Sequence, residues 1–88
     1  MKRNDNFILR DISGKYVLIP FGEQALDFNG IITLNDTAKF LWEICAEETN
    51  QEKLKLALIA EYEIDGETAD KAVECFIKLT KDAGCLYG

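Results

Sequence analysis

Between Gly30 and Glu43 the sequence predicts a short strand that runs directly into a helix, and this junction limits the possible folds more than any other segment. Residues 31–34, Ile-Ile-Thr-Leu, have strand character, and Asn35 follows them at once. Asn35 is a good N-cap, because its side-chain oxygen can accept hydrogen bonds from the free N–H groups of the first helical turn. Apolar residues then recur at helical spacing, at Ala38, Leu41, Trp42 and Cys45. The stretch therefore predicts a strand with no loop between it and an amphipathic helix that buries Trp42.

Two further strands are predicted before this point, over residues 7–12 and 16–20, with a Ser13-Gly14 turn between them. The strand at 16–20 is apolar on both faces, so we expect it at the centre of the sheet. Residues 1–6 form a polar segment that is expected to fray.

Three helices are predicted after the strands, over roughly residues 36–46, 50–61 and 66–83. A capping box at 49–52 starts the second helix and Asp65 caps the third. Gly84 is a left-handed C-cap candidate, and the tail 85–88 is expected to lie back on the core. The expected fold is a single α+β domain over residues 1–88, in which a three-stranded antiparallel sheet is followed by, and packs on, three helices.

The third helix has a wide apolar face. The residues of this face cover an arc of roughly 160°, whereas a helix that packs on a single core needs an apolar stripe of about 100°. They are Ala69, Ala72, Val73, Phe76, Ile77, Leu79, Thr80 and Ala83. One interpretation is a helix that touches two neighbours, with Lys71, Lys78 and Lys81 as solvated charges. The other is a groove wall that suits an acidic peptide, with a lysine rim and an apolar floor at Ala72, Cys75 and Leu79. The sequence leaves both open.

Composition excludes several classes of function. The chain has 88 residues, a net charge of −6 and a pI near 4.5, which argues against a nucleic-acid partner. There is no apolar run long enough to span a bilayer and no secretion signal. The three cysteines, Cys45, Cys75 and Cys85, form no CxxC pair. We interpret them as reduced thiols of a cytoplasmic protein.

No enzyme signal stands out in the sequence. The chain has no histidine, so a zinc site and a Ser/His/Asp arrangement are not expected. Its glycines form neither a GxGxxG nor a P-loop pattern. We therefore expect no catalytic residue, no metal and no cofactor.

The order of these segments resembles the coenzyme PQQ synthesis protein D (PqqD-like) family, the peptide-recognition domains of ribosomally made, modified peptides. The matching segments span most of the chain and are residues 7–12, 17–22, 28–38 with Leu41-Trp42, 61–65 and 76–84. The segment with Leu34-Asn35 and Trp42 is the most specific of them.

The resemblance implies a winged-helix-like domain that is not an enzyme. Such a domain binds the leader of a precursor peptide and presents it to a maturation enzyme, often a radical SAM protein. In the family, the leader pairs as an extra strand with the third strand and lies against the third helix. The corresponding residues here are Gly30, Ile31, Ile32, Thr33, Leu34, Lys71, Ala72, Cys75, Lys78 and Leu79.

Two other functions fit the element order. A winged-helix DNA-binding regulator is possible, but the acidic charge opposes it and the third helix has no arginine for phosphates or bases. A small structural subunit that stabilises an enzyme and has no peptide site is the other alternative.

Overall fold

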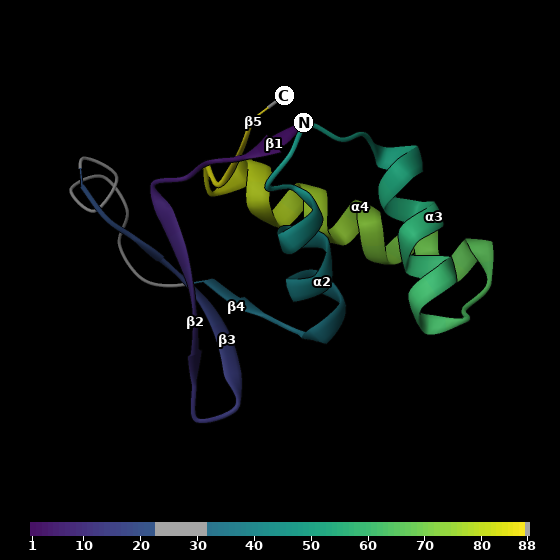
Figure 1. The fold of residues 1–88 in the computed structure, drawn as a ribbon, viewed down its shortest axis with the longest axis horizontal. Helices are drawn as coiled ribbons and strands as arrows, with labels where there is room; N and C mark the ends of the chain where they lie inside the picture. Colours follow the sequence, from purple (N-terminus) through teal and green to yellow (C-terminus); the bar gives the residue numbers. More distant parts are fainter. Residues whose placement is uncertain (23–31, 88) are drawn as a thin grey trace.

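Three antiparallel strands and three helices form the body of the protein, as predicted (Figure 1). The computed structural model describes residues 1–22 and 32–87. The strands of this sheet are β2 (Phe7–Ile12), β3 (Lys15–Pro20) and β4 (Ile32–Leu34). The helices are α2 (Asp36–Ile44), α3 (Gln51–Tyr62) and α4 (Gly66–Asp82). None of the helices in the described ranges is long and apolar enough to cross a membrane.

The sheet order is β2-β3-β4, which places the doubly apolar strand β3 at the centre, as predicted. β2 and β3 form a hairpin in which Ile12 lies opposite Lys15. Its two turn residues both have positive φ, 53° at Ser13 and 83° at Gly14, which matches the twist of a tight hairpin. On the other side of β3, Leu34 of β4 lies opposite Tyr16. Within the described residues, β4 is therefore a terminal strand with one edge unpaired.

Side-chain caps begin all three helices. Asn35 Oδ1 accepts from the N–H of Ala38 at 2.8 Å, and Asp65 Oδ1 accepts from that of Thr68 at 2.7 Å, both as predicted. The predicted capping box at 49–52 is wrong. The N-cap of α3 is Asn50, whose Oδ1 accepts from the N–H of Lys53 at 2.9 Å. Thr49 is buried instead, and its N–H donates to the Met1 carbonyl at 2.9 Å.

The core lies where the sheet meets the three helices. Trp42 is buried, as predicted, and so are the fully enclosed side chains of Leu18, Leu41, Leu54, Leu58 and Val73. α4 contributes Ala69, Val73, Phe76 and Thr80 from one face. The buried Thr80 hydroxyl donates to the Phe76 carbonyl at 2.7 Å, so burial does not leave it without a partner.

The two ends of the chain pair with each other, which corrects the expectation of a frayed N-terminal segment. β1 (Lys2–Arg3) and β5 (Leu86–Tyr87) form a second, two-stranded antiparallel sheet, and both lie near the chain ends in Figure 1. The side chain of Asn4 donates to the Gly84 carbonyl at 3.0 Å. Cys85 and Leu86 are buried, so the tail lies back on the core as predicted.

Candidate functional site

A groove of about 400 Å³ lies between the terminal strand β4 and one side of α4. Its described lining comes from β4, from the start of α2 and from one side of α4 between Thr68 and Leu79. The residues are Thr33, Asn35, Thr37, Ala38, Thr68, Lys71, Ala72, Cys75, Phe76 and Leu79. The lining combines hydroxyl groups, an ammonium group, a thiol and apolar surface.

Strand alternation decides what β4 contributes to this groove. Ile32 and Leu34 are buried in the core, whereas Thr33 between them is exposed and lines the groove. Successive side chains of a strand point to opposite faces. Two residues of β4 therefore pack in the core, and the third, Thr33, is available to a ligand in the groove. Asn35 follows directly and, as the N-cap of α2, fixes where the strand ends and the helix begins.

The wide apolar arc of α4 divides between the core and the groove. Val73 and Phe76 are buried, and Phe76 also borders the groove. Ala72 is half-buried, and Cys75 and Leu79 are exposed along the flank toward β4. A 43% exposed Leu79 beside a hollow is apolar surface that a partner could cover.

A positive charge lies at one place along the groove. Lys71 is on the lining, its side chain is 74% exposed, and its ammonium nitrogen lies 3.6 Å from the Glu67 carboxylate. Lys78 is also exposed on α4 but is not part of the described lining. Since exposed ion pairs of this kind are weak, Lys71 remains available to a negatively charged partner.

The structure brings together five of the residues singled out from the sequence: Thr33, Lys71, Ala72, Cys75 and Leu79. Ile32 and Leu34 point into the core, so they can contribute only backbone groups. Gly30 and Ile31 lie outside the described residues. Sequence reasoning did not include Asn35, Thr37, Ala38, Thr68 and Phe76. Of these, Asn35 could have been predicted from the sequence. It directly follows the strand that was expected to have a free edge, so it must lie close to a groove beside that strand.

The three cysteines differ in accessibility. Burial raises the pKa of Cys45 and of Cys85 to about 11, which keeps both thiols protonated at neutral pH. Cys75 is exposed on the groove flank. A thiol reagent should therefore distinguish the groove from the core.

Comparison with known proteins identifies the family. The family model described as coenzyme PQQ synthesis protein D (PqqD) matches residues 15–86, which include β3, β4 and all three helices. The chain belongs to the PqqD family. The match confirms the resemblance seen in the sequence and covers every described residue of the groove in this PqqD family member.

A solved structure shares the fold. It is described as "TbiB1 in Complex with the TbiA(beta) Leader Peptide", and it is 22% identical in sequence to this PqqD family member, with a TM-score of 0.76. The match covers 100% of this chain and 96% of the TbiB1 chain. Among curated proteins, no significant match is found.

Proposed function

We propose that this PqqD family member binds the leader segment of a ribosomally made precursor peptide and presents it to a maturation enzyme, without catalysis of its own. The observation that carries the proposal is the groove beside a sheet edge, lined by Thr33 on one side and by Ala72, Cys75 and Leu79 on the other. The family match supports it, as does the shared fold with TbiB1, a protein described in complex with a leader peptide.

The proposed binding mode is strand addition. An extended peptide would pair with the free edge of β4 through main-chain hydrogen bonds and direct alternate side chains toward α4. A few such bonds, at about 0.5–1.5 kcal/mol each, with one or two apolar anchors, are enough for micromolar affinity, about −8 kcal/mol. Backbone pairing does not require the side chains of β4 to contact the peptide, which is consistent with the burial of Ile32 and Leu34 in the core.

The groove favours a particular kind of leader. An apolar side chain would cover the exposed Leu79 and the half-buried Ala72, and an acidic side chain would meet Lys71. We propose that Lys78 adds to this attraction from beside the groove. We also propose a cytoplasmic maturation enzyme as the recipient, with a radical SAM protein as the first candidate because such partners are common in the family.

Alkylation of Cys75 tests the location of the peptide. A leader peptide encoded beside the gene would be titrated into the protein, and the rate of Cys75 modification by iodoacetamide followed by mass spectrometry. We expect saturating peptide to slow Cys75 modification at least about tenfold, because a bound peptide would cover the exposed thiol. Cys45 and Cys85 are buried internal controls that should remain unmodified with and without peptide.

The result separates two failures. Peptide that binds by calorimetry while Cys75 reacts at its free rate would place the leader elsewhere on the surface. Absence of binding by any peptide encoded nearby, with or without the maturation enzyme present, would favour the structural-subunit alternative.

A further inference from the structure

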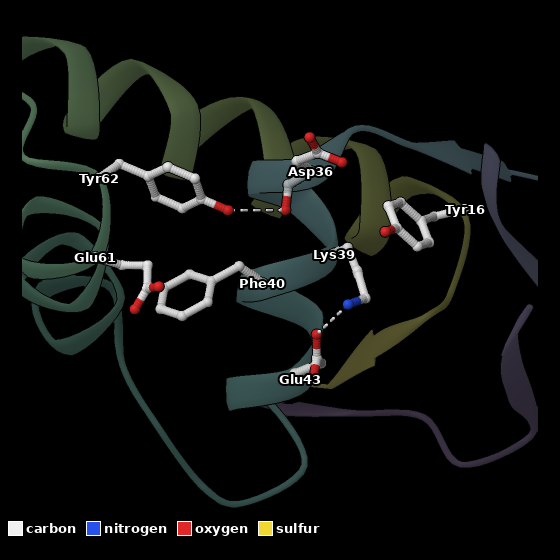
Figure 2. Close-up of a pocket in the computed structure, with 7 residues that line it drawn as sticks. All are labelled: Tyr16, Asp36, Lys39, Phe40, Glu43, Glu61 and Tyr62. Carbon is white, nitrogen blue, oxygen red and sulfur yellow. Dashed lines mark hydrogen bonds and ion pairs between the residues drawn. The ribbon is translucent and has the colours of Figure 1, made fainter. Parts of the chain in front are cut away.

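A second cavity, of about 340 Å³, lies across α2 from the groove. It lies between β3, one side of α2 and the end of α3. β3 contributes Tyr16, α3 contributes Glu61 and Tyr62, and α2 contributes Asp36, Lys39, Phe40 and Glu43. Figure 2 shows the α2 stripe between Glu61 and Tyr62 at one end and Tyr16 at the other. The described linings of the two sites share no residue, so both can be occupied at once.

One end of this cavity already holds a cation. The Lys39 ammonium lies 3.1 Å from the Glu43 carboxylate and 4.9 Å from the centre of the Tyr16 ring. Its hydrogen bond with Glu43 raises the pKa of Lys39. A carboxylate and an aromatic face thus bind a positive charge here.

The other end repeats this chemistry without a cation of its own. The rings of Phe40 and Tyr62 meet edge to face, with centroids 5.7 Å apart, and the Tyr62 hydroxyl donates to the Asp36 carbonyl at 3.4 Å. Glu61 lies on the same side (Figure 2). Within the described residues, neither the Asp36 nor the Glu61 carboxylate is within ion-pair distance of a cationic group.

Two helix ends of opposite polarity border that part of the cavity, the N-terminus of α2 at Asp36 and the C-terminus of α3 at Tyr62. α3 ends at Tyr62 and has no basic residue in its last turn. The carbonyl end of a helix carries partial negative charge, so an acidic residue such as Glu61 is unfavourable for the helix there. Glu61 is thus a carboxylate on the cavity lining that has no ion-pair partner among the described residues, so it can pair with a cationic ligand.

We propose that this second cavity binds an arginine side chain presented by a partner protein. A guanidinium group is planar, stacks on aromatic faces and forms paired hydrogen bonds with carboxylates, so it matches the rings of Phe40 and Tyr62 beside Glu61. Arginine is favoured over lysine because its planar guanidinium can lie flat on a ring and bind a carboxylate through two N–H groups at once, whereas a lysine ammonium is a compact, strongly hydrated point charge. The site goes beyond leader binding, since it leaves the groove free while a second protein docks.

The probe for this site is the tripeptide acetyl-Gly-Arg-Gly-amide, followed by chemical-shift changes in the amide spectrum of the labelled protein. We expect saturable shifts for residues of α2 and for Glu61 and Tyr62, with an affinity on the order of millimolar. The matched peptide with citrulline, which has the same shape and no charge, should give no saturable shift. Equal shifts with citrulline, or shifts confined to Lys71 and Cys75, would overturn the proposal.

Glu61→Gln removes the charge and keeps the shape of the side chain. It should weaken binding of the arginine peptide about threefold, the size expected for one exposed charge contact. Glu47→Gln is the control, since Glu47 is also exposed and lies outside the described lining of the cavity. Glu61→Gln should leave leader binding unchanged, so a failure here is distinct from a failure of the groove. Equal affinities for the arginine peptide in both variants would refute the assignment.

Discussion

At the level of single residues, Lys71 and Lys78 carry the electrostatic part of the leader model. Lys71 lies on the groove lining and Lys78 outside the described part of it. Changing both to glutamate should weaken binding of an acidic leader about three- to tenfold at low salt and barely change the melting temperature, because exposed charges add little stability. Calorimetry on each single variant should show the larger effect at Lys71.

A matched control is a second double variant with the same net charge as the Lys71→Glu, Lys78→Glu protein. Lys15→Glu with Lys53→Glu makes the same change in total charge at exposed positions away from the groove lining. Added salt should reduce the difference between the two double variants, because it shortens the range of charge interactions. Indistinguishable affinities at low salt would remove the lysines from the model.

Trp42 is the residue for which stability and binding are most easily confused. It is 2% exposed, and the Arg3 guanidinium lies 5.7 Å from its ring centre. Trp42→Ala should cost about 3–5 kcal/mol of unfolding free energy, a large share of what a small domain has. Urea denaturation checks this, with Trp42→Phe as the milder control. A Trp42→Ala protein that melts normally and has lost leader binding would instead make Trp42 part of the site.

At the level of elements, the edge of β4 is the proposed pairing surface. Within the plane of the sheet, successive N–H groups of a strand point toward opposite neighbours, so the N–H of Thr33 points to one side of β4 and those of Ile32 and Leu34 point to the other. Proline removes the N–H at its own position. On the side toward β3 it breaks a ladder bond and should destabilise the fold; on the outer side it should remove a donor to the leader. We expect one proline variant to melt like its alanine control and yet fail to bind.

Thr33 gives the cleanest comparison, because its exposed side chain adds little packing loss. At the buried Ile32 and Leu34, substitution by either proline or alanine removes core contacts. At these positions only the difference in stability and in leader binding between the proline variant and the alanine variant is informative. If every folded proline variant binds leader as well as its alanine partner, the leader does not pair with β4.

The elements themselves were largely predictable, and the exceptions have physical causes. The strand-to-helix junction at Asn35 and the cap at Asp65 are local effects, visible in a few adjacent residues. The shift of the α3 cap from Thr49 to Asn50 was not visible, because Thr49 is held by a backbone contact with Met1, far away in sequence. The hydroxyl residues of the groove, Thr37 and Thr68, carry no periodic apolar signal, so they appear only once α2 and α4 are placed.

At the level of the whole molecule, the largest surprise is that the two ends close on each other. Strands of two residues, such as β1 and β5, are too short to show alternation in a sequence, and their pairing depends entirely on the tertiary fold. Arg3 N–H donates to the Cys45 carbonyl at 2.9 Å, and Asn4 N–H to the Cys85 carbonyl at 2.7 Å. The N-terminal segment thus ties the end of α2 to the end of α4, on the elements that also carry the groove.

Adjacent residues of β5 test how much this closure stabilises the fold. Leu86 is 6% exposed and Tyr87 is 57% exposed, so one faces the core and the other faces water. Leu86→Ala should lower the free energy of unfolding by about 2–4 kcal/mol, through lost burial and a residual cavity, while Tyr87→Ala should be nearly neutral. Urea denaturation measures both, and leader binding should persist in each variant under conditions where it is folded, since neither residue lines the described groove. Near-neutral effects of both variants would mean that β5 contributes through its backbone pairing with β1, which alanine leaves in place, and not through the burial of Leu86.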